Sequence, residues 1–152
     1  MGDDLENERI RESLEDIRAR LNQCGLKATP QRLRVYAAMC RMGHASADAV
    51  YHFLGGSRGR MSLATVYNVL ESMTEAGLLV QRPSFNNKMF FDVNTGDHFH
   101  LYNRDSQEMT DITDEALRRS LEARVREWLP DGMALDRVEV QVICHGPARR
   151  EP

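Results

Sequence analysis

Two histidines stand two residues apart in the segment DHFHLY, at positions 98 and 100. Alternate side chains of a β-strand point to the same face, so the imidazoles of His98 and His100 are expected to reach one cation. Two carboxylates lie nearby: Asp92 is six residues before His98, and Asp111 is on the next predicted strand. Antiparallel pairing of these strands would bring Asp111 beside His100. The segment therefore predicts a site for a divalent metal ion.

The net charge of −3 conceals an uneven distribution of charge along the chain. Residues 1–16 carry −5, residues 17–82 carry +6 and residues 83–152 carry −4. A basic middle between acidic ends predicts a polyanionic partner for that part of the chain only. A solvated, arginine-rich helical surface would account for the same charges equally well.

Length and composition exclude several classes of protein. A chain of 152 residues forms one domain or two small ones. No apolar run approaches the roughly 18 residues of a membrane span, and the acidic N-terminus has no apolar signal segment. Three cysteines, with no C-x-x-C, do not make a disulfide framework or a Cys₄ zinc site. These features predict a cytoplasmic protein without a membrane partner.

Helical periodicity dominates the basic part of the chain. An amphipathic helix is predicted over residues 5–24, and three more helices follow it. Capping residues predict where these three begin, at Thr29, Ser46 and Ser62. The last of them, SLATVYNVLESMTEAG, is closed by Gly77. Its apolar stripe is expected to consist of Leu63, Val66, Leu70 and Met73.

The period then changes to that of β-strands. LLVQRPS and KMFFDV, with a turn at Asn86-Asn87, predict a two-stranded hairpin. Three helices and such a hairpin describe a winged helix-turn-helix, whose last helix would enter the DNA major groove. A strand-strand-helix-strand unit follows, ending in a strand predicted over LDRVEVQVIC, and an open sheet edge there favours a homodimer. The predicted fold class is α+β. The predicted parts are a DNA-binding domain over 1–92, a hinge over 93–96, an α/β dimerisation domain over 97–145 and a disordered tail over 146–152.

Four segments together resemble the ferric uptake regulator family of bacterial metal-dependent repressors. They are GLKATPQRLRVY (25–36), HASADAVY (44–51), MSLATVYNVLESMTEAGLL (61–79) and FDVNTGDHFH (91–100), and the resemblance extends over residues 14–145. It implies a winged-helix domain joined to a dimerisation domain, a regulatory metal at the hinge, operator DNA as the partner and no enzymatic activity. The family's ligand positions fall on His44, Asp92, His98, His100 and Asp111. Taken by itself, His44 would be interpreted as a capping or surface residue.

Three imidazoles and two carboxylates without sulfur suit Fe²⁺ or Mn²⁺, with Zn²⁺ possible in vitro. One ion bound by both domains would fix the angle between them and so the spacing of two recognition helices on DNA. Most family members also hold a structural zinc with two C-x-x-C pairs. Here Asn103 and Ser106 stand at the first pair, and only Cys144 is present near the second. No structural Cys₄ zinc is therefore expected.

The ligand separations, 48 residues from His44 to Asp92 and 11 from His100 to Asp111, resemble those of the peroxide-sensing branch. An oxidant produced at such a site would attack the nearest imidazole, so His44 and His98 are the expected oxidation-sensitive residues. The alternative is an iron- or haem-responsive regulator of the same family, which the missing zinc cysteines favour. A metal-dependent oxygenase is a third interpretation, although the chain is too short for a second, substrate-binding lobe. A protein-interaction module that has lost metal control is a fourth.

The resemblance also implies which residues contact DNA. Tyr67 would pack on bases, and Asn68 would read adenine or touch a phosphate. Lys27 resembles the family's minor-groove lysine. The remaining expected contacts are polar or basic side chains of the same surface: Ser62, Thr65, Arg58, Arg60 and Arg82.

Overall fold

A computed structural model of the chain describes residues 13–84 and 87–147. The chain divides into two compact units, the N-terminal unit Met1–Thr95 and the C-terminal unit Gly96–Pro152. Each contains helix and sheet, which confirms the predicted α+β class. Within the described residues, no helix has the length and apolar character needed to cross a membrane. Most of the predicted disordered tail, from residue 148 onward, lies outside the described residues.

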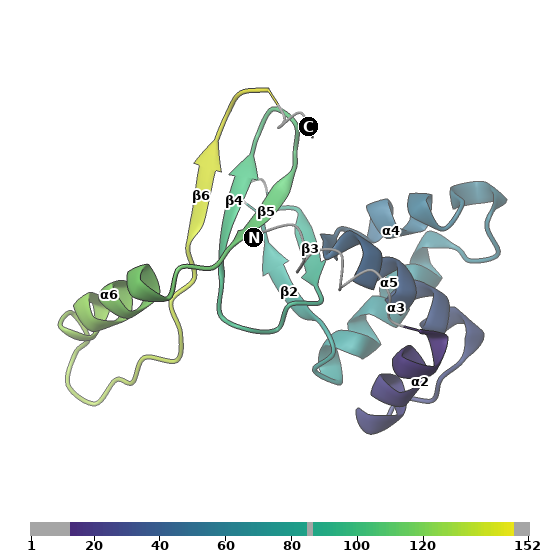
Figure 1. Ribbon diagram of the computed structural model, residues 1–152, viewed down its shortest axis with the longest axis horizontal. Coiled ribbons are helices and arrows are strands. Elements are labelled where there is room, and N and C mark those ends of the chain that lie inside the picture. Colours follow the sequence, from purple (N-terminus) through teal and green to yellow (C-terminus); the bar gives the residue numbers. More distant parts are fainter. Residues whose placement is uncertain (1–12, 85–86, 148–152) are drawn as a thin grey trace. The chain divides into compact units, whose positions relative to one another are not determined.

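Four helices and a short 3-10 turn precede the first sheet hairpin in the described part of the N-terminal unit (Figure 1). They are α2 (Leu14–Gln23), α3 (Pro30–Met42), α4 (Ala47–Phe53), η2 (Gly56–Arg58) and α5 (Leu63–Glu75). The three predicted caps are confirmed, because Thr29, Ser46 and Ser62 each accept a hydrogen bond from the backbone three residues on. The helix predicted over residues 5–24 is wrong in its start, because it does not run through Ser13 into α2. Ser13 forms a capping box with Asp16, so α2 begins at Leu14, and residues 5–12 lie outside the described part.

The core of the N-terminal unit is formed where α5 packs on α3. Val66, Leu70 and Met73 of α5 join Val35 and Met39 of α3 in one buried apolar cluster. The predicted apolar stripe is one residue too long. Leu63 is the first residue of α5 and is 38% exposed. The buried stripe of α5 therefore begins at Val66.

The wing is a three-stranded sheet of order β1-β3-β2. The predicted hairpin is confirmed as β2 (Val80–Pro83) paired antiparallel with β3 (Met89–Asp92). A third strand, β1 (His44–Ala45), pairs with the other edge of β3 and was not predicted. Two residues are too few for side-chain alternation to be visible in a sequence. This strand joins the segment before α4 to the end of the wing.

The C-terminal unit has a second three-stranded sheet, of order β5-β4-β6. Its elements are β4 (Phe99–Asn103), β5 (Met109–Ile112), α6 (Glu115–Arg126) and β6 (Gln141–Cys144). β5 is antiparallel and β6 parallel to the central β4. The strand predicted over residues 135–144 is shorter in the structure, because the chain pairs with β4 only from Gln141 onward. Figure 1 shows α6 extending away from this sheet and covering neither of its faces.

Apolar side chains of the C-terminal unit remain exposed on α6 and β6. No residue of α6 is buried, and Leu117 on it is 45% exposed. Trp128, just after the helix, is 69% exposed, and Val142 and Ile143 on β6 are about half exposed. An amphipathic helix and an edge strand with bare apolar side chains are surfaces that another protein chain normally covers.

Hydrogen bonds fasten the turn between β4 and β5 to the end of β6. Asn103 Oδ1 accepts from the backbone N–H groups of Asp105 (3.0 Å) and Ser106 (3.4 Å), and Asn103 Nδ2 donates to Gly146 O (3.1 Å). Asp105 Oδ2 accepts in turn from Gly146 N (2.9 Å). These contacts join the turn between β4 and β5 to the segment after β6. Asn103 takes part in three of these four hydrogen bonds.

Replacing Asn103 with alanine is expected to lower the free energy of unfolding of the C-terminal unit by about 1–3 kcal/mol, because three hydrogen bonds are lost. Hydrogen exchange should accelerate at the amides of β6. The matched control is Arg104→Ala, since the half-exposed Arg104 side chain makes a weak ion pair with Asp105 at 4.0 Å. Equal stability of the two variants in thermal unfolding would contradict a fastening role for Asn103.

Candidate metal centre

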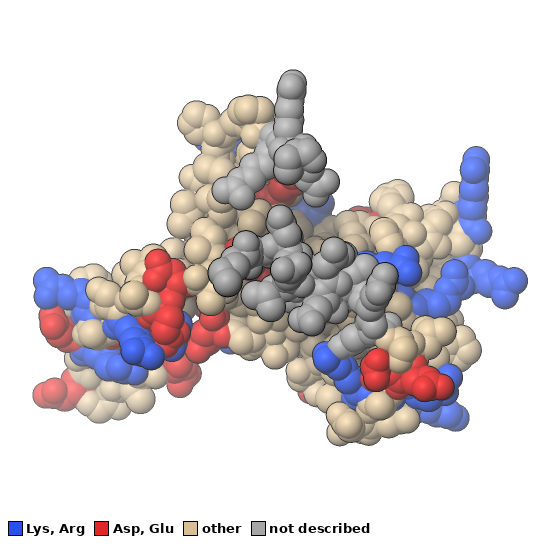
Figure 2. Space-filling model, viewed as in Figure 1, with Lys and Arg blue, Asp and Glu red and all other residues tan. Residues whose placement is uncertain are grey.

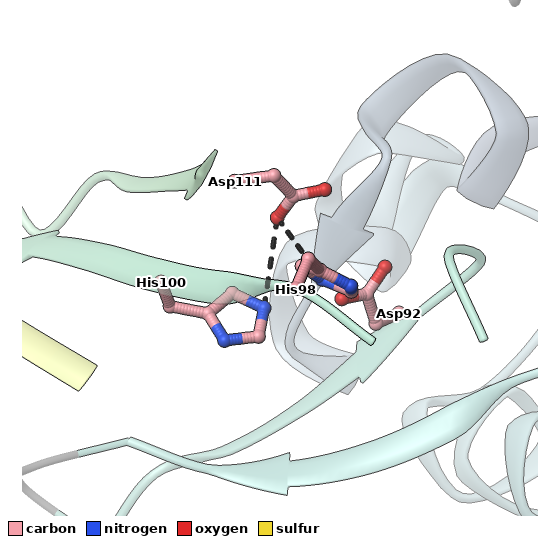
Figure 3. Close-up of side chains that lie close together, drawn as sticks. All are labelled: Asp92, His98, His100 and Asp111. Carbon is pink, nitrogen blue, oxygen red and sulfur yellow. Dashed lines mark ion pairs between the residues drawn. The ribbon is translucent and has the colours of Figure 1, made fainter. Parts of the chain in front are cut away.

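Strands β4 and β5 bring two histidines and one carboxylate of the C-terminal unit together. His100 and Asp111 are directly opposite each other in the antiparallel register, and His98 immediately precedes β4. Asp111 Oδ1 lies 3.5 Å from His98 Nε2 and 3.6 Å from His100 Nε2 (Figure 3). The two imidazole rings pack edge to face with centroids 4.5 Å apart. The side-by-side imidazoles that the H-x-H spacing predicts are therefore present.

The two nitrogen–oxygen distances, 3.5 and 3.6 Å, exceed those of strong hydrogen bonds and lie slightly above the spacing of two ligands on one ion. Strong N–H···O bonds are roughly 2.7–3.2 Å long, shorter than both nitrogen–oxygen distances here. Two ligand atoms each about 2.1 Å from a shared ion lie roughly 3.0–3.4 Å apart. His98, His100 and Asp111 offer ligand atoms within 4.8 Å of one another, and both histidines are at least 94% buried. Two imidazoles and a carboxylate are a donor set suited to Fe²⁺, Mn²⁺ or Zn²⁺.

A backbone contact sets the orientation of the His98 ring. His98 Nδ1 is 2.8 Å from the carbonyl oxygen of Gly96. A carbonyl can only accept a hydrogen bond, so Nδ1 carries the proton and donates it. The lone pair of His98 then lies on Nε2, the nitrogen that faces Asp111. Such a second hydrogen bond fixes the tautomer of a metal-binding histidine.

The wing sheet of the N-terminal unit brings the other two candidate ligands into register. His44 of β1 is directly opposite Asp92 of β3. Opposite residues of an antiparallel pair share a face, with Cβ atoms about 5 Å apart. Asp92 is 1% exposed, and its Oδ1 accepts a hydrogen bond from the backbone N–H of Asn94 at 2.8 Å. The strand β1 that the sequence did not predict is what places His44 beside Asp92.

Arg82 differs from its predicted role as a phosphate contact. It lies on β2 with 8% of its surface exposed, and its Nε is 3.5 Å from Asp92 Oδ2. A buried arginine beside a buried carboxylate is placed to balance that carboxylate, and it is poorly placed to meet DNA. The charge count from the sequence could not separate Arg82 from the exposed arginines. The diagonal relation of Arg82 to Asp92 across the hairpin is the signal that could have done so.

The predicted DNA-contact residues lie on α5 and in the basic loop before it, except Lys27, which lies between α2 and α3. Asn68 is exposed, and Tyr67 is 39% exposed with its ring against the edge of Phe91. Ser62 and Thr65 instead hydrogen bond to each other at the cap of α5. Lys27, Arg58 and Arg60 are exposed. Figure 2 shows lysine and arginine side chains at the end of the N-terminal unit that carries α4.

A groove of about 380 Å³ runs between the start of α3 and the exposed side of α5. Its lining consists mainly of polar side chains, which include Thr29, Gln31, Arg32, Thr65, Asn68 and Ser72. The groove brings the exposed side of α5 next to a helix N-terminus with an arginine beside it. Such a combination is suited to contact with a phosphate-bearing partner.

Residues 23–142 match the sequence model of the Ferric uptake regulator family. The chain belongs to this family. The match covers most of both units. Membership of the ferric uptake regulator family places the chain among regulators and contradicts the interpretation as a metal-dependent oxygenase.

Individual family relatives agree with this assignment. The peroxide-responsive repressor PerR of Staphylococcus aureus is 32% identical over 98 residues, which are 64% of this chain. The chain spans 66% of the length of that curated relative, slightly under two thirds. The ferric uptake regulator of Vibrio cholerae shares the fold, with a TM-score of 0.72 at 23% identity, over 85% of this chain and 98% of its own. The Pseudomonas aeruginosa ferric uptake regulator with manganese has a TM-score of 0.65 at 26% identity, over 87% and 98%.

The cysteines of this family member also bear on the predicted absence of a structural zinc. Cys24, Cys40 and Cys144 all lie in the described residues and form no disulfide. Cys144 of β6 is opposite Asn103 of β4, the position where the family pattern has a cysteine. Asn103 and Cys144, opposite each other in the parallel pair, offer one thiol between them.

Proposed function

We propose that this protein is a metal-dependent transcriptional repressor that binds operator DNA as a homodimer. The observation that carries the proposal is the cluster of His98, His100 and Asp111 in a chain of the ferric uptake regulator family. A regulator needs a site for its signal and a surface for DNA. We assign the DNA surface to the exposed side of α5. Binding to operator DNA places the protein in the cytoplasm.

We further propose that one ion takes ligands from both units. His44 and Asp92 would come from the wing sheet, and His98, His100 and Asp111 from the C-terminal sheet. An ion held by both units would favour one relative orientation of the two. Its binding free energy would thereby be coupled to the spacing of two α5 helices in a dimer, which is the spacing that DNA reads.

The same proposal assigns roles on DNA. α5 would enter the major groove, with Tyr67 packing on bases and Asn68 reading an adenine or touching a phosphate. Lys27 would reach the minor groove, and Arg58 and Arg60 would contact phosphates. Ser62 and Thr65 would serve mainly by capping α5, since their hydroxyl groups bond to each other.

The exposed apolar side chains support a homodimer. Val142 and Ile143 lie on β6, which is an edge strand of the described sheet, and Leu117 lies on the uncovered α6. A second copy of the chain offers the same apolar surfaces and a matching sheet edge, so a two-fold axis would cover both. A twofold dimer would also present two α5 helices to successive turns of DNA.

For the signal, we propose hydrogen peroxide, sensed through Fe²⁺, with Mn²⁺ as the peroxide-resistant substitute. The similarity to the peroxide-responsive repressor PerR of S. aureus supports this choice of signal. Bound Fe²⁺ would supply the electrons that reduce peroxide beside the imidazoles. His44 and His98 are the side chains expected to be oxidised. An iron- or haem-responsive regulator is the second candidate, favoured by Asn103 and Ser106 at the positions of the family's first cysteine pair.

Anisotropy of a labelled fragment of the protein's own promoter tests the proposed function. Under anaerobic conditions, the Mn²⁺-loaded protein is expected to bind the fragment at least about tenfold more tightly than the metal-free protein. A scrambled fragment of equal length and base composition serves as the control. Equal affinity with and without the metal would leave a DNA-binding protein that the metal does not regulate.

Replacing Tyr67 with alanine is expected to weaken operator binding by about 1–3 kcal/mol while the Mn²⁺ affinity stays unchanged. The physical reason is the loss of an exposed aromatic ring from the face of α5 that would meet the bases. Phe53→Ala is the matched control, because Phe53 is also exposed but lies on α4. Equal DNA affinities of the two variants would remove Tyr67 from the interface.

A further inference from the structure

Arg82 lies on the same face of the wing sheet as two of the proposed ligands. It pairs with Phe90, whereas Asp92 pairs with Val80 on β2 and with His44 on β1. Opposite residues of an antiparallel pair share a face. Arg82 is therefore the diagonal neighbour of Asp92, on the side away from His44.

The contacts of Asp92 show how its charge is balanced within the N-terminal unit. Its Oδ2 faces Arg82 Nε at 3.5 Å, and its Oδ1 accepts from Asn94 N at 2.8 Å. The side chain of Asp92 is 1% exposed and that of Arg82 is 10% exposed. A buried carboxylate stays ionised only when nearby cations or donors stabilise its charge. Arg82 is a resident cation that does this without any metal.

We propose that Arg82 lowers the affinity of the metal site by holding the charge of Asp92. A divalent ion that takes Asp92 as a ligand has to share this carboxylate with the guanidinium group. The inference rests on the proposed function, because it treats Asp92 as a ligand. Arg82 acts through Asp92 and is a positioning residue that sets the concentration at which the site fills.

The size of the effect follows from Coulomb's law. Two cations that contact one carboxylate group lie within about 8 Å of each other. At that separation, even with the dielectric constant of bulk water, a unit charge and a divalent ion repel enough to change an affinity about fivefold. The buried surroundings of Asp92 lower the effective dielectric constant and strengthen this repulsion, whereas dissolved salt screens it.

Competition of the full-length protein with a fluorescent chelator for Mn²⁺ tests the proposal. Arg82→Gln removes the charge and is expected to bind Mn²⁺ about fivefold more tightly than the unaltered protein. Arg82→Lys, the matched control, keeps the charge and is expected to stay within about twofold. Asp92→Asn removes the ligand and is expected to weaken binding about tenfold or more.

The outcomes separate the inference from the site on which it rests. If Asp92→Asn leaves Mn²⁺ affinity unchanged, Asp92 is not a ligand and the proposed ligand set fails together with the inference. If Asp92→Asn weakens binding but Arg82→Gln binds equally or more weakly, the ligand set stands and the role of Arg82 is overturned.

Thermal unfolding provides a readout that does not depend on DNA. Metal-free Arg82→Gln should unfold at a lower temperature, because Asp92 loses its buried partner, and Mn²⁺ should raise its Tm more than that of the unaltered protein. An Arg82→Gln variant that does not fold even at saturating Mn²⁺ would show that an ion cannot take the place of Arg82, and would overturn the proposal.

Discussion

Replacing His100 with alanine is expected to lower the affinity for Mn²⁺ by about 100-fold or more and to abolish the metal dependence of operator binding. His100 is 95% buried, and its Nε2 lies 3.6 Å from the carboxylate of Asp111. The substitution removes one imidazole ligand from the cluster, and the alanine side chain offers no ligand atom in its place. Binding of Mn²⁺ is measured by chelator competition, and DNA binding by anisotropy of the same samples. The metal-free variant should bind DNA as weakly as the metal-free unaltered protein.

His145→Ala is the matched control for this experiment. His145 belongs to the same unit, follows β6 and is exposed, so its imidazole is available to solvent but is not part of the cluster. The control should keep both affinities. If His100→Ala and His145→Ala behave alike, the cluster of β4 and β5 does not hold the regulatory ion, and the metal response must be sought elsewhere in the chain.

Local signals in the sequence predicted the elements that carry the site. The caps at Thr29, Ser46 and Ser62 and the hairpin before Asp92 follow from backbone hydrogen bonding and side-chain alternation over short windows. The H-x-H spacing predicted two adjacent imidazoles for the same reason. Asp111 required one more assumption, that its strand pairs antiparallel with that of His100, and the register confirms this pairing.

What the sequence could not predict depends on pairing between distant segments. β1 has two residues, and only its hydrogen bonds to β3 identify it as a strand and place His44 opposite Asp92. Arg82 belongs to the basic part of the chain by composition, yet the hairpin register turns it toward Asp92. Such relations come from tertiary register, which neither periodicity nor charge counting reports.

The two carboxylates among the proposed ligands differ in how their negative charge is balanced. In the C-terminal unit, Asp111 faces the imidazoles of His98 and His100, and an added cation would balance its charge. In the N-terminal unit, Asp92 already has Arg82 beside it. An ion would therefore bind first where the C-terminal ligands attract it and would recruit Asp92 at a free-energy cost. In this order, binding to the C-terminal ligands would be the step that depends on metal concentration, and the recruitment of Asp92 would follow within the molecule.

Hydrogen peroxide is expected to release the Fe²⁺-loaded protein from operator DNA and to leave the Mn²⁺-loaded protein bound. Of the two ions, Fe²⁺ readily gives electrons to peroxide, and an imidazole that takes up oxygen becomes a weaker metal ligand. Loss of the ion would remove the coupling between the units and with it the gain in DNA affinity. Both forms are prepared anaerobically and treated with near-stoichiometric peroxide, and the anisotropy of the labelled operator is followed.

Peptide mass spectrometry of the same samples locates the damage. One added oxygen atom is expected on His44 or His98 in the Fe²⁺ form, whereas His52 and His145, which are exposed and outside the cluster, serve as internal controls. Oxidation spread evenly over all histidines would indicate peroxide chemistry in solution and not at a bound ion. If both metal forms keep their DNA after peroxide, the site responds to iron or haem supply, and the second candidate becomes the better account. The outcome therefore depends on proximity to the ion, because the exposed histidines meet the same peroxide as His44 and His98.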